Sequence, residues 1–174
     1  MAKICLDVDY REAAAMAAAL VFEHWSDARP ARALTRLVTG IEPYVPGQFY
    51  RRELPCLLAV LEQIFEPLET VVIDGYVWLE DESRPGLGAH LFQHFHGAIP
   101  IIGVAKTRFL ASKNSVAVTR GDCSTKPLHV TAAGMSADRA AECIRSMHGG
   151  YRIPTLLREV DHLCRSAAGS LPGM

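Results

Sequence analysis

Two segments near the N-terminus alternate apolar and polar residues with the two-residue period of β-strands. They predict a first strand over residues 3–10 and a third over residues 31–40. The alanine-rich segment 12–25 between them is ambiguous, because alanine favours a helix by intrinsic propensity. Its end, LVFEHW, is typical of a strand, and only a tight connection fits between it and the first strand. We therefore expect three antiparallel strands at the start of the chain.

Further along, short β-branched runs alternate with segments of helical spacing. Apolar residues in 50–65 recur on one helix face, and Pro55 requires this helix to begin close to it or to bend there. Antiparallel strands followed by βα units predict an α/β fold, a mixed sheet with helices on both faces. The remaining strands are expected over 70–75, 99–106, 115–121 and 128–134, and the remaining helices over 86–95, 136–149 and 154–168.

The composition is that of one globular domain. The chain has 174 residues, of which 49% are hydrophobic, so we expect a single domain over residues 1–174. No apolar run is long enough to cross a membrane and no signal peptide is visible, so we expect a cytoplasmic protein without membrane contact. Five cysteines without a Cys-x-x-Cys pair make a disulfide framework or a thiolate zinc site unfavourable.

Four acidic residues occupy positions that are costly for carboxylates. Asp7 and Asp74 stand in apolar strand-like runs, and Glu53 and Asp161 stand in predicted helices. A buried carboxylate loses its hydration unless a cation or hydrogen bonds compensate it. Several such carboxylates from distant parts of the chain suggest a hard divalent metal with oxygen ligands, and therefore metal-assisted phosphodiester chemistry. For any one acid taken alone, a cap or a surface salt bridge is the alternative.

The positions of Asp74 and Lys106 favour one shared site. Ligands of mixed α/β sheets collect at the C-terminal ends of the parallel strands. Asp74 stands at the end of one predicted strand, and Lys106 follows the next in the same way. We therefore expect the two side chains at one edge of the sheet.

The overall charge is compatible with phosphate binding but gives no evidence for it. The net charge is −1, from 18 Lys and Arg against 19 Asp and Glu, whereas nucleic-acid-binding proteins usually carry a basic footprint. If the four candidate ligands are set aside, 18 basic residues face 15 acids. One stretch gathers five basic residues, and it is either part of a phosphate-binding surface or a solvated loop: Lys106, Arg108, Lys113, Arg120 and Lys126.

Six segments of the sequence resemble the endonuclease V family of deoxyinosine 3′ endonucleases, whose fold is ribonuclease H-like. The segments are LDVDY, PYVPGQFYRRELPCLL, VVIDG, RPGLGAHLF, IPIIGVAK and GYRIP, in family order from residue 4 to about 161. The resemblance implies hydrolysis of a phosphodiester bond near a deaminated purine in DNA, with Mg²⁺ as cofactor and Mn²⁺ as a substitute. It also implies a role in DNA repair, and we expect a monomer.

The resemblance assigns the candidate catalytic and metal-binding residues. Asp7, Glu53 and Asp74 match the family's catalytic metal ligands, and Asp161 falls where the family has a late Asp or His ligand. Lys106 matches the lysine of GVAK, close to the scissile phosphate. In this chemistry an ion-bound water attacks the phosphorus, and the lysine neutralises charge on a phosphate oxygen.

The resemblance also assigns contacts to DNA. Tyr44 matches the tyrosine of the wedge that pushes into the duplex beside the target base. A rigid aromatic plate suits that task, because it fills the gap left by an unstacked base. Taken alone, such a tyrosine is more often a loop-packing residue. The complete set of expected DNA contacts is Tyr44, Pro46, Gly47, Lys106 and Gly88.

One loop departs from the family pattern. The family's Asp-Gly is followed by His-Gly and a second histidine, whereas this chain has the segment 76–83, YVWLEDES, with Val77 in place of the glycine. Val77 adds a β-branched side chain where backbone normally approaches the base. Inosine in RNA or a structured nucleic acid therefore remains an alternative substrate. A non-catalytic nucleic-acid-binding module is a further alternative.

Overall fold

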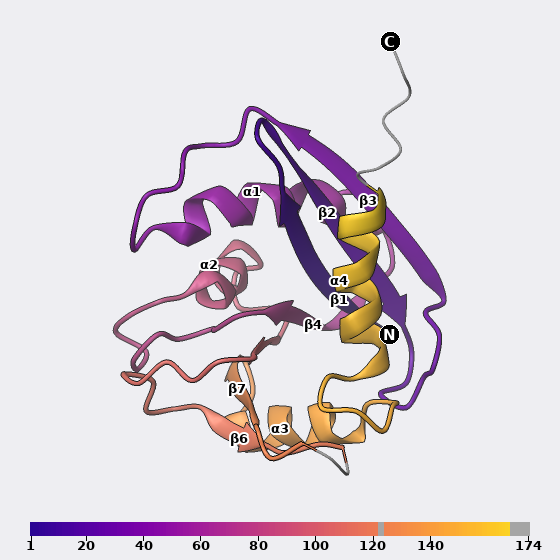
Figure 1. Cartoon of the computed structure of the whole chain (residues 1–174), viewed down its shortest axis with the longest axis vertical. Coiled ribbons are helices and arrows are strands. Elements are labelled where there is room, and N and C mark those ends of the chain that lie inside the picture. The colour runs from indigo at the N-terminus through magenta and orange to yellow at the C-terminus, as the bar shows by residue number, and fades with distance from the viewer. Residues whose placement is uncertain (122–123, 168–174) are drawn as a thin grey trace.

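The computed structural model describes residues 1–121 and 124–167, which form one mixed seven-stranded sheet with helices packed against it (Figure 1). The sheet has the order β3-β2-β1-β4-β5-β7-β6. Its strands are β1 (Ala2–Tyr10), β2 (Ala14–Phe22), β3 (Arg32–Thr39), β4 (Leu68–Asp74), β5 (Ile101–Ala105), β6 (Val116–Val118) and β7 (Leu128–Ala133). The helices are α1 (Phe49–Leu61), α2 (Leu87–His94), α3 (Ala137–Ser146) and α4 (Thr155–Ala167).

The ambiguous alanine segment is a strand, as predicted. β2 pairs antiparallel with both β1 and β3. Its side chains are buried on both faces of the sheet, with Ala17 and Ala19 toward one core and Ala18 toward the other. Tertiary burial therefore overrides the helical propensity of alanine.

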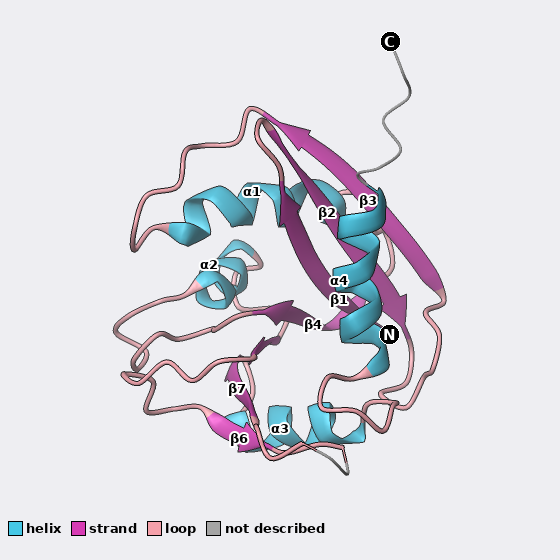
Figure 2. Cartoon of the chain, viewed as in Figure 1, coloured by secondary structure: helices cyan, strands magenta, loops and turns pink. Residues whose placement is uncertain are grey.

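Helices cover both faces of the sheet (Figure 2). α1 and α2 pack on the face that carries Ile4 and Leu6 of β1, and α3 and α4 pack on the opposite face. The central strands read as continuous apolar runs because they are buried on both sides. This arrangement confirms the predicted mixed sheet with helices on both faces.

The central strands β1, β4 and β5 are parallel neighbours. Their C-terminal ends therefore meet at one edge of the sheet, where Asp74 is the last residue of β4 and Lys106 follows β5 directly. β7 pairs antiparallel with β5 and with β6, and these two predicted strands complete the sheet. The connections that leave this edge, 75–86 and 106–115, are the loops available to build a site.

The helix α1 differs from its predicted bounds. It ends at Leu61, so Ile64 and Phe65 lie in the turn that follows, and Phe65 is 88% exposed. Pro55 lies inside this helix, farther from its start than the sequence pattern indicated. The apolar spacing continues past the helix end because Ile64 still packs against the core from the turn.

Cys5, Cys56, Cys143 and Cys164 are buried and free, and Cys123 lies outside the described residues. Within the described residues, no helix combines the length and apolarity that a bilayer crossing requires.

Candidate active site

Asp7 and Glu53 are carboxylates inside the protein. Asp7, on β1, is 9% exposed, and its Oδ1 accepts a hydrogen bond from the backbone N–H of Val8 at 2.8 Å. Glu53, on α1, is 6% exposed. Within the described residues its buried Oε2 has no hydrogen-bond partner. Such an atom retains its full desolvation cost, so the pair is poised for a cationic ligand.

Ionisation of Asp7 and Glu53 at the same time is unfavourable. Burial, with the charges of Asp7 and Asp74, raises the pKa of Glu53 to about 8. Burial, with the charges of Asp74 and Asp161, raises the pKa of Asp7 to about 7, although the hydrogen bond from Val8 opposes the shift. The charges of Asp7, Glu53 and Asp74, which come from three distant segments, therefore interact.

Asp74 and Asp161 are held by cations at the rim of this group. Asp74 Oδ2 accepts a hydrogen bond from Lys106 Nζ at 3.0 Å, and both side chains are 40% exposed. Asp161, on α4, pairs with Arg165 at 3.0 Å. Burial lowers the pKa of Lys106, but the charge and hydrogen bond of Asp74, together with the charges of Asp161 and Asp7, outweigh burial and raise it. A phosphate oxygen that reached Lys106 would compete with Asp74 for this ammonium group.

The donor set fits a hard cation, but the carboxylates are not gathered around a single point. In residues 1–121 and 124–167, no three His, Cys, Asp or Glu side chains form a ready metal cluster. The physical reason is visible in the ion pairs of Asp74 and Asp161, which draw these groups toward Lys106 and Arg165. Oxygen-only donors and the unpartnered Glu53 Oε2 nonetheless match the preferences of Mg²⁺.

A pocket of about 260 Å³ opens beside Glu53 and Asp74. Tyr50 contributes to its wall and stacks on His90, with ring centroids 3.7 Å apart. The sequence did not single out Tyr50 as a pocket residue, because only the fold brings α1 next to the loop after β4; Tyr76 belongs to the loop that the resemblance assigns to the pocket. The full lining consists of Gly47, Phe49, Tyr50, Glu53, Asp74, Gly75, Tyr76, Leu79, Pro85, Gly86 and Leu87.

Val77 and Gly88 lie behind this pocket and not in its lining. Val77 is fully buried, and its backbone N–H donates to Thr131 Oγ1 at 2.9 Å. A Cβ on Gly88 would lie 2.7 Å from Val77 Cγ2, so Gly88 is the residue that makes room for Val77. The expectation that Val77 protrudes where a base is read is therefore not met. Gly88, an expected DNA contact, is buried in the same packing.

The loop that carries Tyr44 adjoins the pocket, because Phe49 and Gly47 belong to the pocket lining. Tyr44 is 57% exposed, and its ring meets Phe49 edge-on with centroids 6.4 Å apart. Pro46 is exposed, and Gly47 has φ +79°, a conformation that favours glycine, and lines the pocket. The loop therefore presents an accessible aromatic ring close to the pocket.

Arg152 stabilises the backbone at Lys106, and the sequence pattern assigned Arg152 no role. Its Nη2 donates to the backbone carbonyls of Lys106 and Pro127, the latter at 2.9 Å. The guanidinium thereby joins the GYRIP segment to the end of β5 and to the start of β7. The only signal was that Arg152 belongs to a family-like segment, and its contacts are long-range ones that spacing does not reveal.

Comparison with known proteins gives one consistent answer. The family model described as endonuclease V matches residues 4–162. Endonuclease V of Streptomyces avermitilis is 32% identical over 144 residues, 72% of this chain and 62% of that protein, and endonuclease V of Streptomyces coelicolor is 33% identical over 72% of this chain and 60% of that protein. The chain thus spans about three fifths of the length of these curated relatives.

Solved structures show the same fold. The crystal structure of endonuclease V from Streptomyces avermitilis has a TM-score of 0.77 and 27% identity, and covers 97% of this chain and 82% of that one. Endonuclease V of Ciona intestinalis, in complex with a DNA containing an inosine followed by a ribo-adenosine, has a TM-score of 0.78 and 19% identity, and covers 97% and 85%. The predicted ribonuclease H-like fold is therefore confirmed.

Proposed function

The chain belongs to the endonuclease V family, and from this premise we propose that it is a metal-dependent endonuclease acting in DNA repair. Its substrate would be a phosphodiester bond near a deaminated purine, deoxyinosine, in DNA. The observation that carries the proposal is that Asp7 and Glu53 are buried carboxylates whose charges act on one another and on Asp74, and that the Glu53 Oε2 has no hydrogen-bond partner among the described residues.

Asp7, Glu53 and Asp74 would hold Mg²⁺, with Mn²⁺ as a substitute and Asp161 as the candidate fourth ligand. When bound, such an ion polarises a phosphoryl oxygen and lowers the pKa of a bound water. The contribution of this chain is the site itself: β1 and α1 place the carboxylates of Asp7 and Glu53 where little water competes for them, and β4 ends in the more exposed Asp74. Burial also keeps Asp7 and Glu53 partly protonated near neutral pH, so binding a cation would release protons.

Lys106 and the aromatic residues would position the nucleic acid. Lys106 would exchange its partner Asp74 for a non-bridging phosphate oxygen and stabilise charge that develops there. The pocket walled by Tyr50, Tyr76 and Leu79 would receive a nucleobase turned out of its stack. Tyr44, exposed on the adjoining loop, would fill the space that this base leaves.

The test of this function is cleavage of an oligonucleotide with a single inosine, in the presence of Mg²⁺ or Mn²⁺. Asp74→Ala should reduce cleavage by about a thousandfold or more while the fold is retained, since Asp74 lies at the rim of the acidic group. Asp138→Ala removes an exposed carboxylate from α3 and should leave cleavage unchanged. Equal activity of wild type and Asp74→Ala would refute the metal assignment.

Inosine in RNA is the second candidate substrate. The observation that favours it is the altered loop 76–83, which forms part of the pocket wall next to Asp74. Competition between DNA and RNA oligonucleotides of the same sequence decides between the two. Salt-dependent binding without cleavage under any metal would instead indicate a non-catalytic binding module.

A further inference from the structure

A second concave surface, which we call the basic groove, lies next to the end of β5. It has a volume of about 750 Å³ and runs between the loop 107–113 and the strands β6 and β7. Two exposed cations, Arg108 and Lys113, belong to its lining, and none of the described residues that line it is a carboxylate. The full lining consists of Arg108, Leu110, Ser112, Lys113, Ser115, Ala117, Pro127 and His129. Because Arg108 follows Lys106 by two residues, the groove adjoins the candidate active site.

Two polar side chains in the lining of this groove, Ser112 and His129, are almost completely buried. Ser112 is 7% exposed, and its buried Oγ has no hydrogen-bond partner among the described residues. His129 is 8% exposed, and burial together with the charges of Arg108 and Arg152 lowers its pKa. Positive charge from two segments therefore acts on His129. A bound anion would offset that field.

The loop that carries the cations is fixed and not loose. Tyr76 Oη donates to the carbonyl of Thr107 and accepts from the N–H of Phe109, both at 2.9 Å. The N–H of Lys113 donates to the carbonyl of Glu80 at 3.0 Å. The loop 76–86 thus holds both ends of the loop 107–113, so Arg108 and Lys113 extend from an anchored backbone.

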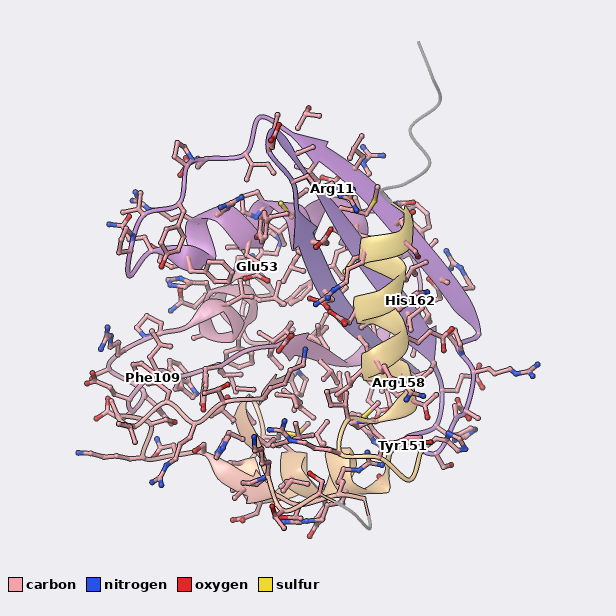
Figure 3. The ribbon with its side chains drawn as sticks, in the orientation of Figure 1. Arg11, Glu53, Phe109, Tyr151, Arg158 and His162 are labelled. Atoms are coloured by element: carbon pink, nitrogen blue, oxygen red, sulfur yellow. The ribbon has the colours of Figure 1, made fainter. Side chains whose placement is uncertain are left out.

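Apolar side chains line the outer edge of the loop. Leu110 is 87% exposed and Phe109 is 36% exposed, with the guanidinium of Arg84 at 6.0 Å from the Phe109 ring. Figure 3 shows Phe109 among the loops at the left of the view, below Glu53. On the neighbouring loop, Glu80 pairs with Arg84, and Asp81 accepts from Ser83 while its charge also interacts with that of Lys113. Exposed apolar groups beside cations suit a strand that has both bases and phosphates.

We propose that the basic groove binds the sugar–phosphate backbone of the nucleic-acid strand where it continues past the bond that is cut. In this arrangement successive phosphates meet Lys106, then Arg108 and Lys113, and bases contact Phe109 and Leu110. The inference rests on the proposed function and adds a second contact surface to it. Sequence is not read here, since cations on a groove recognise phosphate and not base edges.

The experiment measures binding without catalysis, so that it does not depend on a working metal site. Wild type and the double variant Arg108→Ala/Lys113→Ala are titrated with a fluorescent inosine-containing DNA in EDTA over a series of salt concentrations. The variant should bind roughly tenfold more weakly, and its slope of log K against log salt should be smaller by about 2, because two phosphate contacts are lost. The charge-conserving Arg108→Lys/Lys113→Arg should keep most of the wild-type slope.

A matched control removes the same charge elsewhere. Arg29→Ala/Arg145→Ala takes two exposed arginines from outside the groove and should keep affinity and slope near those of wild type. Equal losses in the two double variants would overturn the groove, since the effect would then be one of net charge. Thermal unfolding of each variant confirms that comparisons are made between folded proteins.

A length series locates the contact on the DNA. Extending the duplex on one side of the inosine at a time should strengthen wild-type binding on one side only, and the double variant should lose that gain. A gain that the double variant keeps would contradict the proposal.

The proposed function and the basic groove can fail separately. Groove-dependent binding without cleavage would sink only the proposed function, and cleavage with unchanged binding in the double variant would sink only the groove.

Discussion

The acids at the sheet edge and the loop that follows β4 are fixed by different means. Asp7 and Glu53 are placed by a buried strand and a packed helix, and their burial is electrostatically unfavourable. Tyr76, Val77 and Trp78 are instead placed by hydrogen bonds to Thr107, Phe109, Thr131 and Ala132. Groups on regular elements keep their geometry when neighbouring loops change. A chain can therefore retain the chemistry of its family while its base-reading loop differs.

Lys106 combines features of both regions. It follows the last residue of β5 and pairs with Asp74, but it lies in the loop after that strand. Lys106→Ala should lower the cleavage rate by about a hundredfold, because charge on the phosphate loses its nearby ammonium group. Mn²⁺ affinity should be retained or improved, since Asp74 loses its competing cation. Calorimetric titration with Mn²⁺ and single-turnover cleavage measure the two effects. Loss of metal binding together with cleavage would contradict the separate role of Lys106.

The buried acid Glu53 should also make the stability of the metal-free protein depend on pH. The pKa of Glu53 is about 8 in the fold, whereas an exposed glutamate titrates near ~4.3, so folding favours the protonated acid. Stability is then complete at low pH and falls as the pH rises from about 5 toward 8. Glu53→Gln cannot ionise and should be more stable near pH 8, by about 2 kcal/mol.

Urea unfolding in EDTA measures this difference. Wild type should converge on Glu53→Gln as the pH is lowered toward 5, and saturating Mn²⁺ should remove the disadvantage of wild type at high pH. Parallel stability curves for the two proteins across this range would show that burial of Glu53 has no electrostatic cost.

A substitution in the loop 76–86 should change cleavage less than a substitution of the acids. Tyr76→Phe keeps the ring in the pocket wall but removes the hydroxyl that bonds Thr107 and Phe109. Each lost hydrogen bond is worth about 1 kcal/mol, so kcat/KM should fall by roughly threefold to thirtyfold, with most of the change in KM. Steady-state kinetics on the inosine substrate give the result. An unchanged KM with a lower kcat would place Tyr76 with the edge residues.

The sequence predicted best where periodicity and burial act together. The strands β1 and β3 follow from alternation, β2 from its β-rich end and the tight connection before it, and the burial of Asp7 from its apolar strand. The roles of the four acids as ligands come from the family resemblance and stay a prediction. The orientation of Val77 into the core and the support of Lys106 by Arg152 did not follow. Both depend on contacts between residues far apart in the chain, Val77 with Gly88 and Thr131 and Arg152 with Lys106, which local patterns do not encode.

The basic stretch illustrates the same limit. Lys106, Arg108 and Lys113 were visible as a cluster, but the pattern allowed a solvated loop equally well. The sequence placed Lys106 and Asp74 at one edge of the sheet, and the fold shows them paired. Only the fold shows that Arg108 and Lys113 border a groove that contains the buried Ser112. Charge counts identify candidates, and the three-dimensional arrangement separates their roles.

The most direct test of the account is a crystal structure of the protein soaked in Mn²⁺, with the ion located by anomalous scattering. The account predicts an ion bound by carboxylate oxygens of Asp7, Glu53 and Asp74, with Asp74 turned away from Lys106. An ion bound elsewhere, or these three carboxylates left without one at saturating Mn²⁺, would contradict it.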